Sequence, residues 1–411
     1  MGDTTAPNTD GAPEGTGTVS QAKPASQMDT ATTTEERPQF DSTLHYLMTA
    51  IGYAVGLGNL WRFPRVAWEN GGGAFLIPYF TCLVFFGMPL FYFESFIGQF
   101  TQSGANKVFF RYMPAFQGIG WAMALLSQQV NIYYPIIVGW SLVYIQSILS
   151  GNVDKWTTCD NPWNTVDCVS PFETARLCKD EERIRQEGGA VMYKGNCEYG
   201  NATKLQAIRE KIQIPTSEFF ERYVLQRSEG IFSFAGPSWT GTKEYEEIPR
   251  EPSMMNWQLL FSMAFLWGVS FLILWKGVKS MGKASFITTP VPYLIVGAFF
   301  IRSLFLDGME IGLYAYLVPN FDKLADLSTW RAALYQCCMS LTVGYGGLHT
   351  MASYNRPDHN SFRDAWIVVL ADSLMSIIGG SAVYATLGHL SYATQIPLDQ
   401  LDVTGKFEAR C

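Results

Sequence analysis

Charged residues are scarce in this sequence: Asp, Glu, Lys and Arg make up 16% of its 411 residues, whereas hydrophobic residues make up 48%. A soluble chain of this length carries more charge. Basic residues are too few to form a face that neutralises phosphates, because the net charge is -7. We therefore expect a membrane protein that contacts lipid and has no nucleic acid partner.

Signatures of several other protein classes are missing. Residues 1–41 contain no basic segment followed by a short apolar one, so we expect no cleavable signal peptide. The absence of Gly-x-x-x-x-Gly-Lys, and of Gly-x-Gly-x-x-Gly in a strand context, argues against nucleotide hydrolysis and dinucleotide binding. No Asp-Arg-Tyr triplet follows the third apolar run, which argues against a seven-span receptor. We expect no enzyme.

Long apolar runs dominate the rest of the chain. Each is long enough to cross a hydrocarbon core of about 30 Å. They cover residues 43–67, 74–96, 119–149, 257–275, 286–306, 332–354 and 365–391. We expect an all-α polytopic membrane protein with a disordered N-terminus (1–41), a core of these seven spans (42–391) and a C-terminal tail (392–411).

The connections between the runs differ in charge. Those after the second and fourth runs are basic, with Lys107, Arg111, Lys276, Lys279 and Lys283. The positive-inside rule then predicts a cytoplasmic N-terminus in the plasma membrane and an external loop at residues 150–256. An oxidising exterior favours disulfides among four cysteines of this loop, Cys159, Cys168, Cys178 and Cys197. Three connectivities are possible, of which we favour Cys159 with Cys168, and Asn201 in Asn-Ala-Thr is a glycosylation acceptor.

Glycines interrupt the first and the sixth runs. In the first, Gly52 and Gly56 alone would suit a helix-packing face, but the pattern continues to Gly58 and Asn59. In the sixth, Gly344 begins a Gly-Tyr-Gly-Gly sequence. A helix broken inside the membrane exposes backbone groups that can hold a carboxylate and a cation. Two such runs predict a transporter built from two inverted repeats of five helices each (5+5), in which helices 1 and 6 are broken. Transport would be driven by an ion gradient.

Three ionisable residues lie in or at the end of the runs: Arg62, Glu94 and Asp372. Such residues are costly in lipid and are functional candidates. We expect Glu94 to accept hydrogen bonds from backbone exposed by the broken helices, rather than to bind substrate. Asp372 is interpreted as a cation ligand, with a buried structural acid as the alternative. Tyr134 suits membrane-interface or core packing as readily as a functional contact, and its hydroxyl needs a partner if it is buried.

Several motifs together resemble the neurotransmitter:sodium symporter family. They are Gly-Tyr-Ala-Val-Gly-Leu-Gly-Asn-Leu-Trp-Arg-Phe-Pro (52–64), Glu-Asn-Gly-Gly-Gly-Ala-Phe (69–75), Asn-Ile-Tyr-Tyr (131–134), Cys-Asp-Asn-Pro-Trp-Asn (159–164) and Ala-Ser-Tyr-Asn (352–355). The resemblance extends over residues 37–391. It implies sodium-coupled symport of a small molecule by alternating access.

The resemblance also implies a residue for each role. The substrate carboxylate would lie against the amides of Leu57 and Gly58 and the hydroxyl of Tyr134. The substrate side chain would be surrounded by Ala54, Val130, Met339, Thr342 and Tyr345. The first sodium site would use Ala54, Asn59, Ser340 and Asp372, and the second would begin with Gly52 and Val55. A chloride site would use Tyr79, Gln336, Ser340 and Ser376. The outer gate would use Arg62, and the cytoplasmic gate Arg37 with Phe40.

Three departures from the family pattern refine these expectations. Monoamine carriers have Asp at the position of Gly56, so a neutral amino acid is the expected substrate. Asp372 replaces the usual Asn, as in insect-type nutrient amino acid transporters, and its charge lessens the need for chloride. The sequence ends without an eighth span, which suggests a C-terminally truncated form that does not concentrate substrate alone. The alternative is a non-transporting partner that associates with full-length relatives and regulates them.

Overall fold

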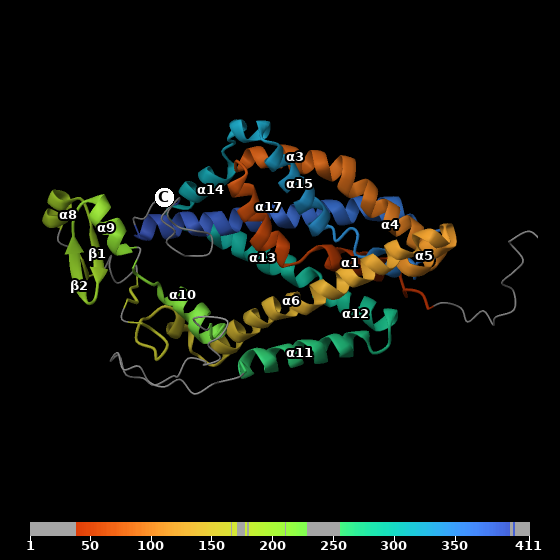
Figure 1. The fold of residues 1–411 in the computed structure, drawn as a ribbon, viewed down its shortest axis with the longest axis horizontal. Helices are drawn as coiled ribbons and strands as arrows, with labels where there is room; N and C mark the ends of the chain where they lie inside the picture. The colour runs from red at the N-terminus through yellow and green to blue at the C-terminus, as the bar shows by residue number, and fades with distance from the viewer. Residues whose placement is uncertain are drawn as a thin grey trace, which may run out of the picture. The chain divides into compact units, whose positions relative to one another are not determined.

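Long helices make up most of this computed structural model (Figure 1). The structure describes residues 38–165, 167–170, 177–178, 181–209, 211–227, 255–394 and 398. Arg37 and most of the expected N-terminal and C-terminal segments therefore lie outside the described residues. Within the described part, five helical stretches are long and apolar enough to cross a membrane. They cover Gly73–Thr101, Pro114–Leu149, Trp257–Leu274, Val278–Ser303 and Ser361–Ala393.

Each of these stretches corresponds to one of the expected apolar runs. The first is composed of η3 (Gly73–Phe75), α3 (Leu76–Cys82), the π-helical turn η4 (Leu83–Gly87) and α4 (Met88–Thr101). The second joins η5 (Pro114–Phe116) to α6 (Gln117–Leu149). The third is α11 (Trp257–Leu274) and the last lies within α17 (Ser361–Thr394). A short helix, α5 (Ala105–Tyr112), separates the first two stretches.

The fourth stretch begins earlier than the sequence indicated. α12 (Val278–Thr288) and α13 (Pro290–Ser303) follow one another across Thr289, so Lys279 and Lys283 belong to a helix rather than to a short connection. The expected boundary at residue 286 was wrong because hydropathy marks only the apolar part of a helix, and α12 extends through the basic residues that precede it. The actual turn is confined to Trp275–Gly277.

The first and sixth runs are interrupted in the structure. The first is divided into α1 (Thr43–Ala54), a π-helical turn η2 (Gly58–Arg62) and α2 (Phe63–Glu69). The sixth is divided into α15 (Leu327–Ser340) and α16 (Gly347–Ala352). Between the fifth and sixth runs lie α14 (Met309–Leu317) and the 3₁₀ helix η8 (Phe321–Ala325). The glycine-rich segments are therefore the positions at which helical continuity is lost.

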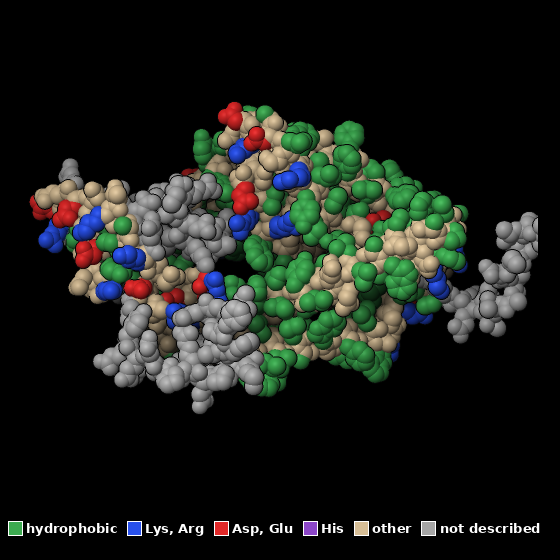
Figure 2. Space-filling model, viewed as in Figure 1, with side chains coloured by type: hydrophobic (Ala, Val, Ile, Leu, Met, Phe, Trp, Pro, Cys, Tyr) green, Lys and Arg blue, Asp and Glu red, His purple; other side chains and the backbone are tan. Residues whose placement is uncertain are grey.

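The helices differ in how far their apolar side chains are buried. The largest buried cluster combines residues of α1, α4, α15, α16 and α17. By contrast, Leu272 of α11 and Leu294 of α13 are 68% and 71% exposed. Figure 2 shows hydrophobic side chains over much of the visible surface of the helical part. An apolar surface of this extent is suited to contact with lipid.

The backbones of α14 and α17 approach closely at Gly312. A Cβ atom at this glycine would meet the carbonyl oxygen of Tyr384 and the amide of Gly388 on α17. Because the obstacle is backbone, the two helices would have to separate to accept even a methyl group. The two helices pack against each other, and Figure 1 shows α14 beside α17.

We expect Gly312→Ala to destabilise the chain by about 1–3 kcal/mol through this overpacking. Gly297→Ala on α13 is the matched control, since a Cβ atom at Gly297 would have no other atom within 4 Å. Unfolding midpoints of the purified chain in detergent compare the two variants. Equal midpoints would contradict the close helix contact.

The segment after α6 forms a small disulfide-linked region. It contains η6 (Val153–Trp156), α8 (Glu181–Glu187), a hairpin of β1 (Ala190–Tyr193) and β2 (Asn196–Tyr199), α9 (Ala202–Arg209), α10 (Pro215–Glu218) and the π-helical η7 (Phe219–Val224). β1 pairs with β2 in antiparallel register, with Ala190 opposite Tyr199. The predicted Cys159–Cys168 disulfide is present, and Cys178 pairs with Cys197. Asn201 is exposed and accepts a hydrogen bond from the amide of Lys204 at 3.0 Å, so it caps α9.

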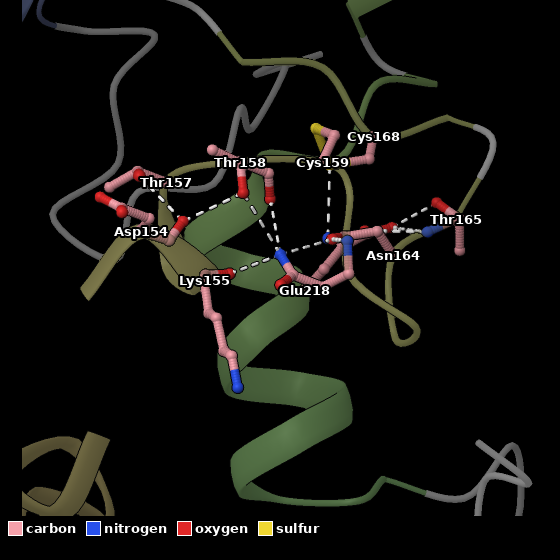
Figure 3. The surroundings of a disulfide bond; sticks show 10 residues. Asp154, Lys155, Thr157, Thr158, Cys159, Asn164, Thr165, Cys168 and Glu218 are labelled. Atoms are coloured by element: carbon pink, nitrogen blue, oxygen red, sulfur yellow. Dashed lines mark hydrogen bonds between the residues drawn. A yellow bond between two sulfur atoms is a disulfide. The ribbon is translucent and has the colours of Figure 1, made fainter. Parts of the chain in front are cut away.

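Glu218 connects the Cys159–Cys168 loop to α10 (Figure 3). Its buried carboxylate accepts hydrogen bonds from the Asn164 amide at 2.9 Å, from the Thr165 backbone amide at 3.0 Å and from the Thr165 hydroxyl. Charge-assisted bonds of this kind are stronger than neutral ones. The loop therefore depends on Glu218 as well as on its disulfide.

Removing the Glu218 carboxylate leaves buried donors of the loop without an acceptor, so we expect Glu218→Ala to cost about 1–3 kcal/mol of local stability. Hydrogen exchange of the amides in residues 159–168 measures the effect. Glu198→Ala is the control, because the Glu198 side chain forms an exposed ion pair with Lys204, and such a pair contributes little to stability. Similar exchange in both variants would show that Glu218 does not hold the loop.

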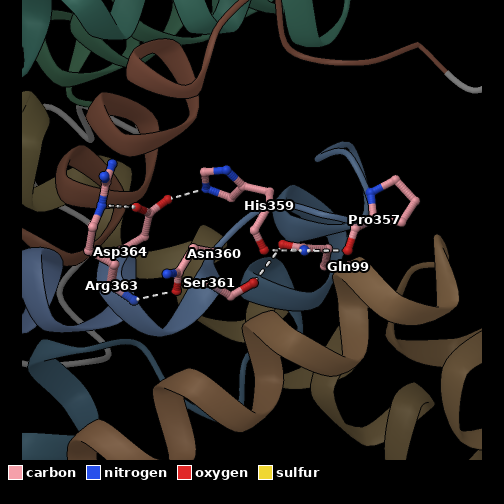
Figure 4. Close-up of polar contacts among 7 residues, drawn as sticks. All are labelled: Gln99, Pro357, His359, Asn360, Ser361, Arg363 and Asp364. Carbon is pink, nitrogen blue, oxygen red and sulfur yellow. Dashed lines mark hydrogen bonds and ion pairs between the residues drawn. The ribbon is translucent and has the colours of Figure 1, made fainter.

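The turn that precedes α17 is held by the end of α4 (Figure 4). The Gln99 side-chain amide donates to the carbonyl oxygens of Pro357 and His359 at 3.1 and 2.7 Å, and accepts from the Ser361 hydroxyl at 2.6 Å. His359 also lies 2.5 Å from Asp364, on the first turn of α17. These contacts fix where α17 begins and therefore where Asp372 lies.

Candidate ion and substrate site

The break in the first run leaves backbone carbonyl groups without partners. α1 ends at Ala54 and Val55 is extended, with φ -82° and ψ 115°. Among the described residues, the carbonyl oxygens from Gly52 to Val55 accept no backbone hydrogen bond. Orphan carbonyls of this kind, at the end of a helix, are available to a cation. Gly52, Ala54 and Val55 are residues for which the sequence predicted sodium contacts.

The same break also exposes backbone amides, which follow the unpaired carbonyl groups in the chain. The amide of Leu57 lies 3.4 Å from the Tyr134 hydroxyl and donates to it. A Cβ atom at Gly58 would meet nothing within 4 Å, so the space beside this residue is open. The structure thus brings together the three groups expected at a substrate carboxylate: the amides of Leu57 and Gly58 and the hydroxyl of Tyr134. Amides at a helix start favour an anion.

Asn59 joins the first run to α17. Its side-chain amide donates to Asp372 Oδ1 at 2.7 Å and to the Ser376 hydroxyl at 2.8 Å. Its side-chain oxygen accepts from the amide of Gly56 at 3.0 Å. Asn59 and Asp372 are both almost completely buried. A carboxylate in such a position needs hydrogen bonds or a cation to offset its desolvation.

Ser340, the last residue of α15, completes this cluster. Its hydroxyl lies 2.8 and 3.0 Å from the two carboxylate oxygens of Asp372 and donates to them. The side chains of Asn59, Ser340 and Asp372 therefore meet, although they come from three different runs. Together they provide amide, hydroxyl and carboxylate oxygens, which are the ligands that a hard cation prefers.

The four residues expected at a chloride site also lie around this cluster. Tyr79 and Gln336 are buried, and neither the Tyr79 hydroxyl nor Gln336 Oε1 has a hydrogen-bond partner in the described part of the chain. The Ser340 hydroxyl donates to the Asp372 carboxylate and the Ser376 hydroxyl to the Asp372 backbone oxygen at 3.1 Å. A hydroxyl has one proton. Two of the expected chloride donors are therefore already engaged by Asp372.

The break in the sixth run is stabilised by Glu94. Thr342 and Gly344 have φ angles of 52° and 90°, so the chain leaves the helical conformation here. Glu94 is buried on α4, and its Oε1 accepts from the amide of Gly344 at 2.7 Å. The structure thus places Glu94 against exposed backbone of a broken helix, which is the environment that the sequence suggested.

The remaining expected pocket residues lie near these breaks. The Tyr345 hydroxyl lies 2.9 Å from the Met339 sulfur, so these two side chains meet. The Tyr345 carbonyl accepts from the Ser127 hydroxyl at 2.7 Å. Ser127 shares one face of α6 with Val130 and Tyr134, given their spacing. Ser127 was missed by the sequence analysis, since an isolated Ser in an apolar helix gives no functional signal.

The expected gate residues have aromatic neighbours. The Arg62 guanidinium lies 4.4 Å from the centre of the Tyr335 ring. Phe40 packs edge-on against Tyr46, and its amide donates to the Tyr354 carbonyl at 3.2 Å. Tyr335 could not be singled out from the sequence, because aromatic residues are common in apolar runs. Arg37, the other expected gate residue, lies outside the described residues.

These features define a helical membrane protein with a buried polar site between two broken helices. A model of the sodium:neurotransmitter symporter family matches residues 37–407. The chain belongs to this family, whose members are transporters and not enzymes.

Relatives of this chain carry names of sodium-dependent transporters. The sodium-dependent transporter snf-5 of Caenorhabditis elegans is 36% identical over 389 residues, which cover 92% of this chain and 50% of the relative. The sodium- and chloride-dependent glycine transporter 2 of Xenopus laevis is 32% identical over 366 residues, which cover 89% and 44%. The sodium-dependent serotonin transporter of Drosophila melanogaster is 32% identical over 377 residues, which cover 91% and 52%. The chain thus spans about half the length of these curated relatives.

Proposed function

We propose that this chain forms part of a plasma-membrane carrier that couples the inward movement of Na⁺ to that of a neutral amino acid by alternating access. The observation that carries this proposal is the buried cluster of Asn59, Ser340 and Asp372, in which Asn59 directly follows the Leu57 and Gly58 amides of the first break. A cation at the cluster and a carboxylate at the amides would each reduce the cost of burying the other charge.

The donor set favours sodium over softer cations. Asn59, Ser340, Asp372 and the carbonyl of Ala54 offer oxygen ligands, and no thiolate or imidazole is required. In the first site, the Asn59 side chain would turn its oxygen toward the ion. The carbonyl oxygens of Gly52 and Val55 would begin a second site. We propose that the N-terminal end of α1 faces the cytosol.

Gly56 favours an amino acid over an amine. A Cβ atom at this position would lie 3.1 Å from the Tyr134 hydroxyl, closer than most such contacts. An acidic side chain, which an amine without its own carboxylate would need, would therefore crowd Tyr134. An amino acid supplies the carboxylate itself and leaves the space open.

Chloride is a weaker requirement in this proposal. The hydroxyls of Ser340 and Ser376 donate to Asp372 and so have no second proton for an anion. The negative charge of Asp372 also takes the place of the counter-charge that chloride would supply. We propose that Na⁺ binding here depends on Asp372 more than on chloride.

The test uses a full-length carrier that contains residues 38–394, reconstituted in vesicles with an inward Na⁺ gradient. Leucine and methionine are expected to accumulate only with Na⁺, whereas serotonin is not. Replacing Na⁺ by choline should abolish uptake and replacing chloride by gluconate should reduce it little. Amino acid uptake independent of Na⁺, or uptake of serotonin alone, would overturn the proposal.

A further inference from the structure

A buried histidine lies beside Glu94 at the second helix break. His349, on α16, is completely buried, and its Nδ1 lies 3.3 Å from Glu94 Oε2. Neither ring nitrogen of His349, nor Glu94 Oε2, has a hydrogen-bond partner in the described structure. His349 was not predicted as a functional residue, although an ionisable residue in an apolar run is itself a functional signal.

The surroundings provide no fixed cation for this carboxylate. Within the described ranges, no Lys or Arg forms an ion pair with Glu94. Among the described residues, the titratable groups that interact electrostatically with Glu94 include Tyr53 of α1 and Cys338 of α15. From α5, the Phe109 ring packs 5.9 Å from the imidazole, while Arg111 donates to the Thr101 carbonyl. The charged groups at the start of α17, His359 and Asp364, pair with each other.

The charge balance of this pair depends on one proton. With Glu94 ionised and His349 neutral, the pair would carry an uncompensated negative charge in a water-poor interior, which is costly. One added proton makes the pair neutral, either as imidazolium with carboxylate or as imidazole with carboxylic acid. Both arrangements place the proton among the atoms that lack hydrogen-bond partners.

We propose that Glu94 and His349 together form a proton-binding site at the break of the sixth run. The site goes beyond sodium coupling and does not require it. Glu94 Oε1 also accepts from the Gly344 amide, so the proton lies on the group that holds the broken helix. An ionised carboxylate accepts this bond more strongly than a neutral acid does. Proton binding at Oε2 would thus loosen the hold on Gly344.

Solid-state NMR of the whole chain in lipid bilayers tests this site near neutral pH. Imidazole nitrogens are labelled with ¹⁵N and glutamate carboxyl carbons with ¹³C. The His349 and Glu94 signals are identified by their loss in His349→Gln and Glu94→Gln. If either variant does not fold, His349 is assigned by elimination from single His45→Gln, His359→Gln and His389→Gln variants, and Glu94 by its ¹³C–¹⁵N contact with His349.

The expected result is one proton more than neutral imidazole and ionised carboxylate carry together. It would be seen as a doubly protonated His349 ring with ionised Glu94 or as a neutral ring with protonated Glu94. In the first case, Glu94→Gln should convert His349 to the neutral form at the same pH. A neutral His349 ring beside an ionised Glu94 in the wild-type chain would overturn the proposal. Because no transport is measured, this outcome is independent of whether the carrier uses sodium.

Discussion

Asp372→Asn is expected to weaken the response to sodium at least tenfold, which corresponds to about 1.4 kcal/mol or more. The carboxylate is fully buried and is the group in the cluster that brings a full negative charge next to the proposed ion. Asn at this position would retain an oxygen ligand but no charge. It would also release the proton of the Ser340 hydroxyl, which now donates to the carboxylate. Chloride dependence should therefore increase in the variant.

Two measurements follow the effect of this substitution. One is stabilisation of the purified chain by increasing NaCl, sodium gluconate or KCl, read as the shift of the unfolding midpoint. The other is uptake per surface molecule in a full-length carrier across the same salts. Asp364→Asn is the matched control, since Asp364 is a buried acid on the same helix and Asn keeps a hydrogen-bonding partner for His359 at the start of α17. If the ion profiles of Asp372→Asn and wild type superimpose, Asp372 is a structural acid and not an ion ligand.

Tyr134→Phe is expected to raise the half-saturation constant for an amino acid by roughly 10-fold to 150-fold. The reason is the loss of one hydroxyl partner for a desolvated carboxylate, worth about 1.5–3 kcal/mol. The hydroxyl already lies against the Leu57 amide, at the place where the first helix is broken. If Tyr134 only packs, the Phe ring preserves its function and the constant does not change.

Binding and uptake of a labelled amino acid in the full-length carrier distinguish these outcomes. Tyr133→Phe is a suitable control, because Tyr133 is the adjacent residue on α6 but points in another direction around the helix. An equal effect of both substitutions would argue for general packing of α6. A loss of affinity confined to Tyr134→Phe would support a direct contact with the carboxylate.

The sequence predicts the membrane-spanning helices well, because the membrane imposes the same requirement on each of them. Charge-poor runs must form their backbone hydrogen bonds internally in a membrane, so their length and composition predict α6, α11 and α17 closely. The two interruptions were predicted for a related reason, because glycine clusters weaken a helix. The start of α12 was missed, since Lys279 and Lys283 mark the end of the apolar part and not the end of the helix.

Side-chain partners were harder to predict than elements. The sequence named Asn59, Ser340 and Asp372, but which atoms donate and which accept depends on how three distant runs pack. The second disulfide, Cys178–Cys197, depends on the hairpin between its cysteines. His349 becomes notable only when its nearest acid is known, and that acid lies on α4, more than two hundred residues earlier in the chain.

The contacts of α4 with the sixth run have a mechanical consequence. Gln102 donates to the Asn355 carbonyl at 2.8 Å just beyond α16, Gln99 holds the turn after it, and Glu94 holds Gly344 just before it. Gly98 lies against the backbone of His349 between these points. α16 is thus held to α4 along its whole length, whereas the hydrogen bonds of the described residues show no such series between α15 and α4. In the proposed alternating-access cycle, α16 and α4 would move together as one rigid unit, and residues 341–346 would act as the hinge.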